Sequence, residues 1–314
     1  MSRSTSLVHA PPPSSRAARG RAILCVMGAA ATFALAAVAV KLLGGAVPVM
    51  QVILCRNLFA IPPLLALALW QAPRGNRLSV LATRNPWAHA QRTLYGLVGM
   101  FGSFYGYIHL PMAMVTALGF TMPLFLTALS VPLLGEKVGW RRSCAVLVGF
   151  CGVLLMLRPG AGDGMGEGAL HLPATLAVLA GAVAWALAMI TIRRMGEQGE
   201  SGSAIVLWFA IGGALVGGLG AIPGWVWPTP GQWALLAAVG LVSSLAQLLM
   251  TAAYRSGDTT LIAPFEYSGI LWTMSFGMLL WGEMPDGWDF AGIAVLVASG
   301  LYIWHREVRR GVKR

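Results

Sequence analysis

Charged residues are scarce in this chain. Asp, Glu, Lys and Arg make up 11% of the 314 residues, whereas hydrophobic residues make up 57% and mean hydropathy is +0.72. A soluble domain usually has about 25% charged residues, so the composition excludes an ordinary soluble protein. Acidic residues are the scarcest, 11 against 22 basic ones, which gives a net charge of +11. The basic residues lie in the gaps between apolar runs, as in cytoplasmic loops, so we expect no nucleic-acid partner.

Cysteine and recognisable catalytic motifs are also scarce. The four cysteines all lie within apolar runs, which gives no disulfide framework: Cys25, Cys55, Cys144 and Cys151. The five histidines are scattered, and the chain has no HExxH, GxSxG or Walker lysine. We therefore expect no metal, no cofactor and no enzyme activity. One alternative to this expectation stays open, namely an intramembrane enzyme or a non-transporting membrane scaffold.

Long apolar runs fill most of the chain. A helix needs about 20 apolar residues to cross the hydrocarbon core of a bilayer. The first run is too long for a signal-peptide core and is interpreted as a retained helix. The runs predict ten transmembrane helices, at 22–45, 48–70, 88–110, 112–134, 142–157, 172–192, 203–226, 231–253, 259–281 and 288–304.

The basic residues predict how these helices are oriented. With ten crossings, all but three of the 22 Lys and Arg fall on the side that holds both termini. The exceptions are Lys41 and Arg158 on the opposite side, and Arg56 inside a helix. Because cytoplasmic loops carry the excess of Lys and Arg, both termini are predicted to be cytoplasmic, in a bacterial inner membrane.

The two halves of the chain resemble each other. Residues 107–136 align without gaps on residues 254–283, which places Gly135-Glu136 on Gly282-Glu283. Residues 32–41 likewise align on residues 184–193. Five helices per half is an odd number, so the second half must enter from the opposite face. The sequence therefore predicts an inverted repeat, as in many secondary transporters.

Two stretches that contain these Gly-Glu pairs carry a family resemblance. They are PLLGEKVGWRRSCAVLVGFCGVLLMLRP at 132–159 and its degenerate copy LLWGEMPDGWDFAGIAVLVASGLYI at 279–303. With the five-plus-five helix pattern, they make residues 22–305 resemble the drug/metabolite transporter superfamily, specifically its EamA-like members. The resemblance implies an all-α integral membrane protein, with two inverted five-helix repeats around a central cavity and transport by alternating access.

The expected organisation follows from the runs and from this resemblance. The Gly-rich stretch GAGDGMGEG at 160–168 lies between the two halves. It is interpreted as a flexible connector and not as a phosphate-binding loop, because no strand precedes it and no Lys-Ser/Thr follows it. The expected parts are a disordered cytoplasmic tail (1–20), a first EamA-like repeat (21–159), the linker (160–171), a second EamA-like repeat (172–305) and a basic cytoplasmic tail (306–314).

Two charged residues lie deep within the predicted helices. Arg56 and Glu266 sit inside apolar runs, with Pro264 close to Glu266 and Gly119 at the matching position of the first half. Charges at such depth usually face the bundle interior and mark functional sites. Two interpretations stay open. The pair forms a structural salt bridge, or Arg56 attracts an anionic substrate group while Glu266 binds a cationic group or carries a coupling proton.

Neutral polar and aromatic residues complete the candidate substrate site. An aromatic wall with a few polar groups suits an organic solute, although such residues also serve in interfacial belts and helix contacts. The candidates are Asn57, Tyr105, Tyr107, Trp185, Trp208, Gln247, Tyr267 and Trp272. The expected function is secondary transport of a small organic metabolite that is amino-acid-like, vitamin-like or nucleoside-derived and has an anionic or zwitterionic group. The expected partners are this substrate and the lipid bilayer, and a homodimer is left open.

Residues near helix ends are expected to play structural parts. Lys41 and Arg193 occupy matching positions in the two halves, where their side chains can reach the membrane interface. Glu136 and Glu283 are interpreted as loop or cap groups. The GxxxG spacings at 102–106 and 213–217 predict close helix packing.

Overall fold

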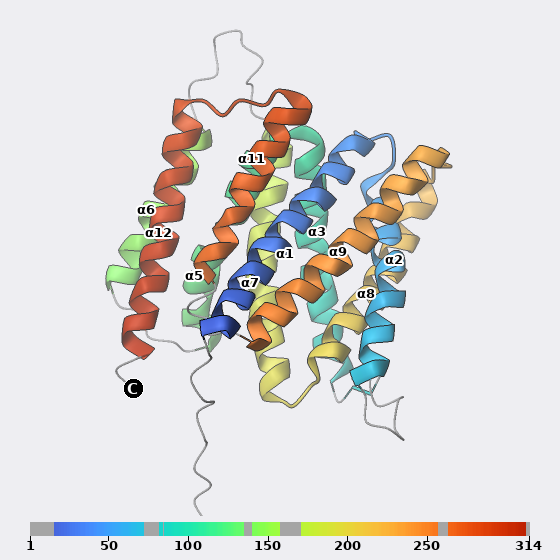
Figure 1. Ribbon diagram of the computed structural model, residues 1–314, viewed down its shortest axis with the longest axis horizontal. Coiled ribbons are helices and arrows are strands. Elements are labelled where there is room, and N and C mark those ends of the chain that lie inside the picture. The colour runs from blue at the N-terminus through green and yellow to red at the C-terminus, as the bar shows by residue number, and fades with distance from the viewer. Residues whose placement is uncertain are drawn as a thin grey trace, which may run out of the picture.

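Helices form the regular structure of the residues described by the computed structural model, 16–71, 82–83, 85–134, 140–157, 171–256 and 263–311 (Figure 1). The expected tail over 1–15, most of the linker and the Gly135-Glu136 pair lie outside these ranges. The elements are α1 (Arg16–Leu43), α2 (Val49–Gln71), α3 (Pro86–His109), α4 (Met112–Gly119), α5 (Met122–Leu134), α6 (Trp140–Leu157), α7 (Leu172–Glu197), α8 (Gly202–Ala221), η2 (Ile222–Gly224), α9 (Pro230–Ser256), η3 (Ala263–Tyr267), α11 (Ser268–Trp281) and α12 (Gly287–Gly311).

Local sequence signals explain several helix ends. Asn85 caps α3 by accepting a hydrogen bond from the Ala88 amide at 3.1 Å, and Pro86 follows at the first helical position. Ser201 caps α8 in the same way through the Ala204 amide, also at 3.1 Å. Gly282 ends α11 with a left-handed backbone at φ 66°, which glycine adopts without strain.

The structure differs from the expected helices at four places. The fourth run is two helices, α4 and α5, separated at Phe120 and Thr121. The ninth begins as the short 3-10 helix η3, where Pro264 cannot donate a backbone hydrogen bond. The helices at the two ends of the described chain are longer than expected, since α1 begins at Arg16 and α12 continues to Gly311. Arginine favours helix, so a basic segment can extend a helix beyond its apolar part.

Several of these helices have the length and composition of membrane spans. Among the described residues seven segments qualify, at Gly20–Leu43, Val49–Trp70, Met112–Leu129, Leu172–Glu197, Gly202–Gly224, Pro230–Met250 and Gly287–Arg306. The segment Met112–Leu129 runs across the break between α4 and α5. Many large apolar side chains point outward, such as Leu24, Leu215 and Leu279, which are 69%, 64% and 79% exposed. An apolar exterior suits a lipid environment, and the molecule is a multi-pass membrane protein.

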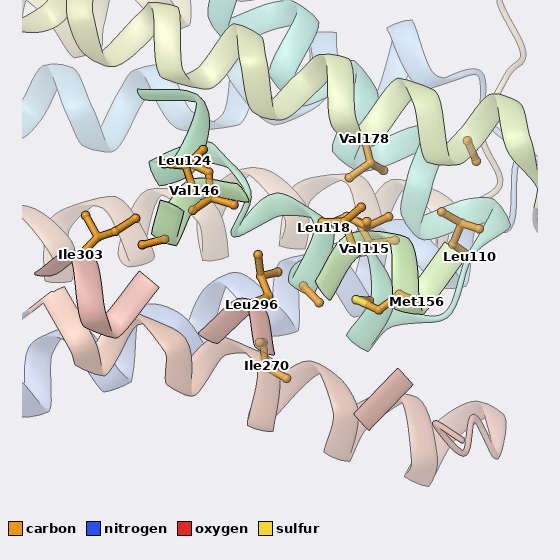
Figure 2. Packing of buried hydrophobic residues seen from close by; sticks show 14 residues of the cluster. Leu110, Val115, Leu118, Leu124, Val146, Met156, Val178, Ile270, Leu296 and Ile303 are labelled. Carbon is orange, nitrogen blue, oxygen red and sulfur yellow. The ribbon is translucent and has the colours of Figure 1, made fainter. Parts of the chain in front are cut away.

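The helices pack as a bundle with four main contacts. These join α1 to α9, α3 to α7, α2 to α8 and α6 to α12. The start of α1 and the end of α12 lie at the same end of the bundle (Figure 1). A large apolar cluster fills the space where α4, α5, α6, α11 and α12 meet, and Leu118, Leu124 and Leu296 are fully buried in it (Figure 2).

Small residues permit the closest of these contacts, as the GxxxG spacings predict. A Cβ at Gly152 of α6 would lie 2.8 Å from the Gly292 carbonyl oxygen of α12. A Cβ at Gly102 of α3 would collide with the Ala177 carbonyl of α7, and one at Gly217 would lie 2.8 Å from the Leu54 amide nitrogen of α2. The predicted close packing at both GxxxG motifs is therefore confirmed.

Candidate functional site: a buried arginine pair

Arg56 lies inside the bundle, on α2. Its side chain is 8% exposed, and Nη1 donates a hydrogen bond to Asn57 Oδ1 at 3.1 Å. Asn57 is fully buried and is held in turn by its own hydrogen bond to the Ile53 carbonyl, at 2.8 Å. The Arg56 guanidinium carbon lies 5.9 Å from the centre of the Phe209 ring of α8. Two of the predicted site residues, Arg56 and Asn57, are thus fixed together in the interior.

A second buried arginine approaches the same ring from α3. Arg92 is 6% exposed, and its guanidinium carbon lies 4.2 Å from the Phe209 ring centre and 5.6 Å from that of Trp185 on α7. These contacts have the geometry of cation–π interactions. Its Nε and Nη1 have no hydrogen-bond partner in the described structure. We call Arg56 and Arg92, with Phe209 against both, the arginine pair.

The sequence alone did not single out Arg92. It lies near the start of the apolar run 88–110, so it was counted among the basic residues of the cytoplasmic side. The overlooked signal is the spacing of Arg92, Gly96 and Gly99, which lie at i, i+4 and i+7 and so share one helix face. A Cβ at Gly96 would collide with Arg92 Nη1 and Phe209, and one at Gly99 would collide with Trp185. The glycines therefore mark the face of α3 that receives the guanidinium and the aromatic rings.

The electrostatics of the pair are unusual for a membrane interior. Neither guanidinium has an ion-pair partner among the carboxylates of the described residues. Buried charges in membranes normally pair with one another or line a water-filled path. The π faces of Phe209 and Trp185 stabilise a cation by about 0.5–2 kcal/mol each, which is less than a full counter-charge provides.

Glu266 lies elsewhere in the bundle. It is half-buried in η3, which packs against α1, α11 and α12, whereas Arg56 lies on α2, which packs mainly against α8 and α9. No described contact joins the two residues. Tyr267, the next residue, packs its ring against Phe120 with ring centres 4.7 Å apart. This ring contact joins η3 to the break between α4 and α5.

The remaining candidates are dispersed over three regions. Trp185 and Gln247 lie near the arginine pair, and Gln247 lines a cavity of about 10 Å³ beside Arg56, room for one water. The Tyr107 hydroxyl lies 3.4 Å from Thr116 Oγ1, and Tyr105 packs on Phe101 and His109.

Trp208 and Trp272 lie farther out. Trp208 packs against His89, with ring centres 6.0 Å apart, and lines a largely apolar cleft of about 350 Å³ between α3 and α8. Trp272 is 37% exposed and stacks on Phe276. The structure therefore does not gather the predicted aromatic residues into one wall.

Lys41 forms a network of contacts at the end of α1. It makes an ion pair with Glu283, and Nζ donates a hydrogen bond to the Leu110 carbonyl at 2.8 Å. Glu283 Oε2 also accepts a hydrogen bond from the Met112 amide at 2.9 Å, and Trp281 lies 5.4 Å from Lys41 Nζ. This network ties α1, α11 and the junction of α3 and α4 together. The Arg193 side chain and Glu136, their counterparts in the other half, are not among the described side chains.

Taken together, the fold and these residues define a multi-pass helical membrane protein with charged and polar groups held in its interior. The chain belongs to the EamA-like transporter family, whose model matches residues 20–158 and again residues 172–304. The resemblance inferred from the sequence is thereby confirmed.

The names of similar proteins are consistent with membership of this family. A riboflavin transporter of Rhizobium johnstonii is 32% identical over 74% of this chain and 75% of its own length. An S-adenosylmethionine uptake transporter of Rickettsia bellii is 28% identical over 75% and 78%. The pseudopaline exporter CntI of Pseudomonas aeruginosa is 30% identical over 66% and 71%. These relatives are named as transporters of small molecules, and the protein is a transporter rather than an enzyme.

A solved crystal structure shares the fold. It aligns with a TM-score of 0.63 at 22% identity, covering 93% of this chain and 98% of the other. At this identity the match concerns the architecture alone.

Proposed function

We propose that this protein is a secondary transporter that moves a small organic metabolite across the bacterial inner membrane by alternating access. The proposal includes ten crossings, arranged as two inverted five-helix repeats around a central cavity. The two separate matches to one family model support a duplicated chain, with repeats over 21–159 and 172–305, the linker 160–171 between them and tails at 1–20 and 306–314.

The packing of the helices supports the repeat. The alignment of the halves relates α1 to α7, α2 to α8, α3 to α9 and α6 to α12. If each helix is replaced by its counterpart in the other half, the α1–α9 contact becomes the α7–α3 contact, and both are main contacts of the bundle. The α2–α8 and α6–α12 contacts each join a helix to its own counterpart, as expected for helices beside a pseudo-two-fold axis.

The observation that carries the proposal is a pair of matched helix breaks. The first-half helix is interrupted after Gly119, at Phe120, and its mate changes from η3 to α11 after Tyr267. In the alignment Phe120 corresponds to Tyr267, and these two rings are in contact. Interrupted helices at corresponding positions of two inverted halves are the best sequence-level indicator of a transporter's substrate site.

The substrate class follows from the interior groups and the relatives. The named relatives carry riboflavin, S-adenosylmethionine and pseudopaline, which supports an organic metabolite that is amino-acid-like, vitamin-like or nucleoside-derived. Buried Arg56 favours a substrate with an anionic or zwitterionic group, since a guanidinium binds carboxylates through paired hydrogen bonds.

Uptake into proteoliposomes tests the function. Radiolabelled riboflavin, S-adenosylmethionine and amino acids serve as probes, with protein-free liposomes as the control. A transporter accumulates or exchanges at least one of these solutes unchanged, whereas an enzyme would convert a solute without moving it. Converted solute and no net movement for any probe would contradict the proposal for these substrate classes.

Cysteine labelling tests the topology. In a variant with all four native cysteines replaced, Gly164→Cys in the linker should react with an impermeant reagent added from the periplasmic side. The matched control is a cysteine at Ser2 in the N-terminal tail, which should react only from the cytoplasm. A Gly164→Cys variant that reacts only from the cytoplasm would overturn both the ten-crossing topology and the inverted repeat.

A further inference from the structure

The arginine pair buries two cations for which the described part of the protein supplies only partial compensation. Arg56 has one neutral acceptor, Asn57 Oδ1, and Arg92 has two nitrogens without an acceptor. Both side chains are more than nine-tenths buried. Structural arginines in a protein interior are usually saturated by acceptors, because each unsatisfied donor costs free energy.

The surroundings hold the pair in place without neutralising it. Phe209 lies against both guanidinium groups, and Trp185 lies against Arg92 from α7. Gly96 leaves the space that Arg92 Nη1 occupies. Four helices, α2, α3, α7 and α8, therefore converge on two like charges. Such an arrangement leaves the missing negative charge to be supplied by a ligand.

We infer that Arg56 and Arg92 together bind a substrate group with two negative charges, either two carboxylates or a phosphate. This inference rests on the proposed transport function and specifies its substrate class. Arginine suits the task because its planar group offers five donors and stays charged when buried. A group with one negative charge neutralises only one member of the pair, so the site discriminates by charge as well as by shape.

Binding to purified protein in detergent tests the site without requiring transport. The probes are acetate, succinate and inorganic phosphate, compared at equal ionic strength by thermal unfolding. Succinate or phosphate should stabilise the wild-type protein, and acetate should do so far less. Removing one buried charge contact costs at least about 2 kcal/mol, so Arg92→Gln should weaken binding of the effective dianion by roughly 30-fold or more.

Two further variants separate ligand binding from structural support. Arg21→Gln removes an exposed arginine from α1 and should leave the response to anions unchanged. Arg92→Lys keeps the charge and should retain part of the response if Arg92→Gln fails to fold. Without added anion, Arg92→Gln should unfold at a higher temperature than wild type, because it removes a buried cation that lacks a counter-charge. A saturated structural arginine would give the opposite shift.

Phosphate also occurs in lipid headgroups. Nanodiscs of defined lipid composition distinguish binding of a lipid phosphate from binding of free phosphate. Wild type and Arg92→Gln are compared in phosphatidylglycerol and in phosphatidylcholine, each with and without free phosphate. Stabilisation that requires phosphatidylglycerol and not free phosphate would show that the arginine pair binds a lipid headgroup, which would overturn the inference of a substrate site.

Equal responses to acetate, succinate and phosphate would overturn the inference, as would an undiminished response of Arg92→Gln. Uptake by the wild-type protein in the same preparation reports on the proposed function separately. Transport without dianion selectivity would remove the inference and leave the transporter in place.

Discussion

Arg56 is the residue whose chemistry can be changed most cleanly. Its hydrogen bond to Asn57 and its contact with Phe209 use the planar guanidinium, and lysine offers a single ammonium in its place. Arg56→Lys should therefore fold but transport roughly 10- to 100-fold more slowly. Initial uptake rates in proteoliposomes measure this, with Arg21→Lys as the exposed control. Normal rates for both Arg56→Lys and Arg56→Ala would remove Arg56 from substrate binding.

Two glycines provide a second test at single residues. A Cβ at Gly96 would collide with Arg92 and Phe209, whereas a Cβ at Gly119 meets no atom within 4 Å. Gly96→Ala should lower the stability by about 1–3 kcal/mol, because overpacking displaces neighbouring side chains. Gly119→Ala should be neutral or raise it by up to about 1 kcal/mol. Unfolding in detergent compares the two, and equal shifts would mean that the α3 face is not tightly packed against the arginine pair.

At the level of elements, hydropathy predicted where the apolar runs lie but not how continuous their helices are. The break at Phe120 and Thr121 lies in a run without a charge, so hydropathy alone could not reveal it; Pro123 and Gly119 were the available signals. Arg56, Asn57 and Trp185 were predicted because polar and aromatic groups inside an apolar run are conspicuous. Arg92 and the Lys41–Glu283 pair were missed because charges near run ends usually belong to loops.

The Lys41–Glu283 network links three elements at one end of the bundle. Both side chains are largely buried, so breaking the pair on one side leaves the other charge poorly compensated. Lys41→Met and Glu283→Gln should each destabilise the protein. The double variant should be at least about 1 kcal/mol more stable than the sum of the single effects predicts. A double-mutant cycle by thermal unfolding measures this coupling, and additive effects would show that the contact contributes nothing to stability.

On the scale of the whole molecule, secondary transport as proposed above uses the energy of a gradient or of solute exchange. The sequence has no Walker lysine that would indicate nucleotide hydrolysis. Glu266 is the candidate proton carrier, since it lies next to one of the two matched helix breaks, at the position that corresponds to Gly119 of the first half. The protonation state of a residue at this place can shift the equilibrium between the inward-open and outward-open conformations.

Glu266→Gln separates the two roles open to this carboxylate. If Glu266 carries the coupling proton, the neutral amide should abolish accumulation driven by a pH gradient while exchange of labelled for unlabelled solute continues. If Glu266 is a structural partner, both transport modes and the unfolding temperature should fall together, because the group paired with Glu266 loses its counter-charge. Uptake with and without an imposed pH gradient, alongside counterflow, distinguishes these results. Full gradient-driven accumulation by Glu266→Gln would exclude the proton role and leave another group, or solute exchange, to drive transport.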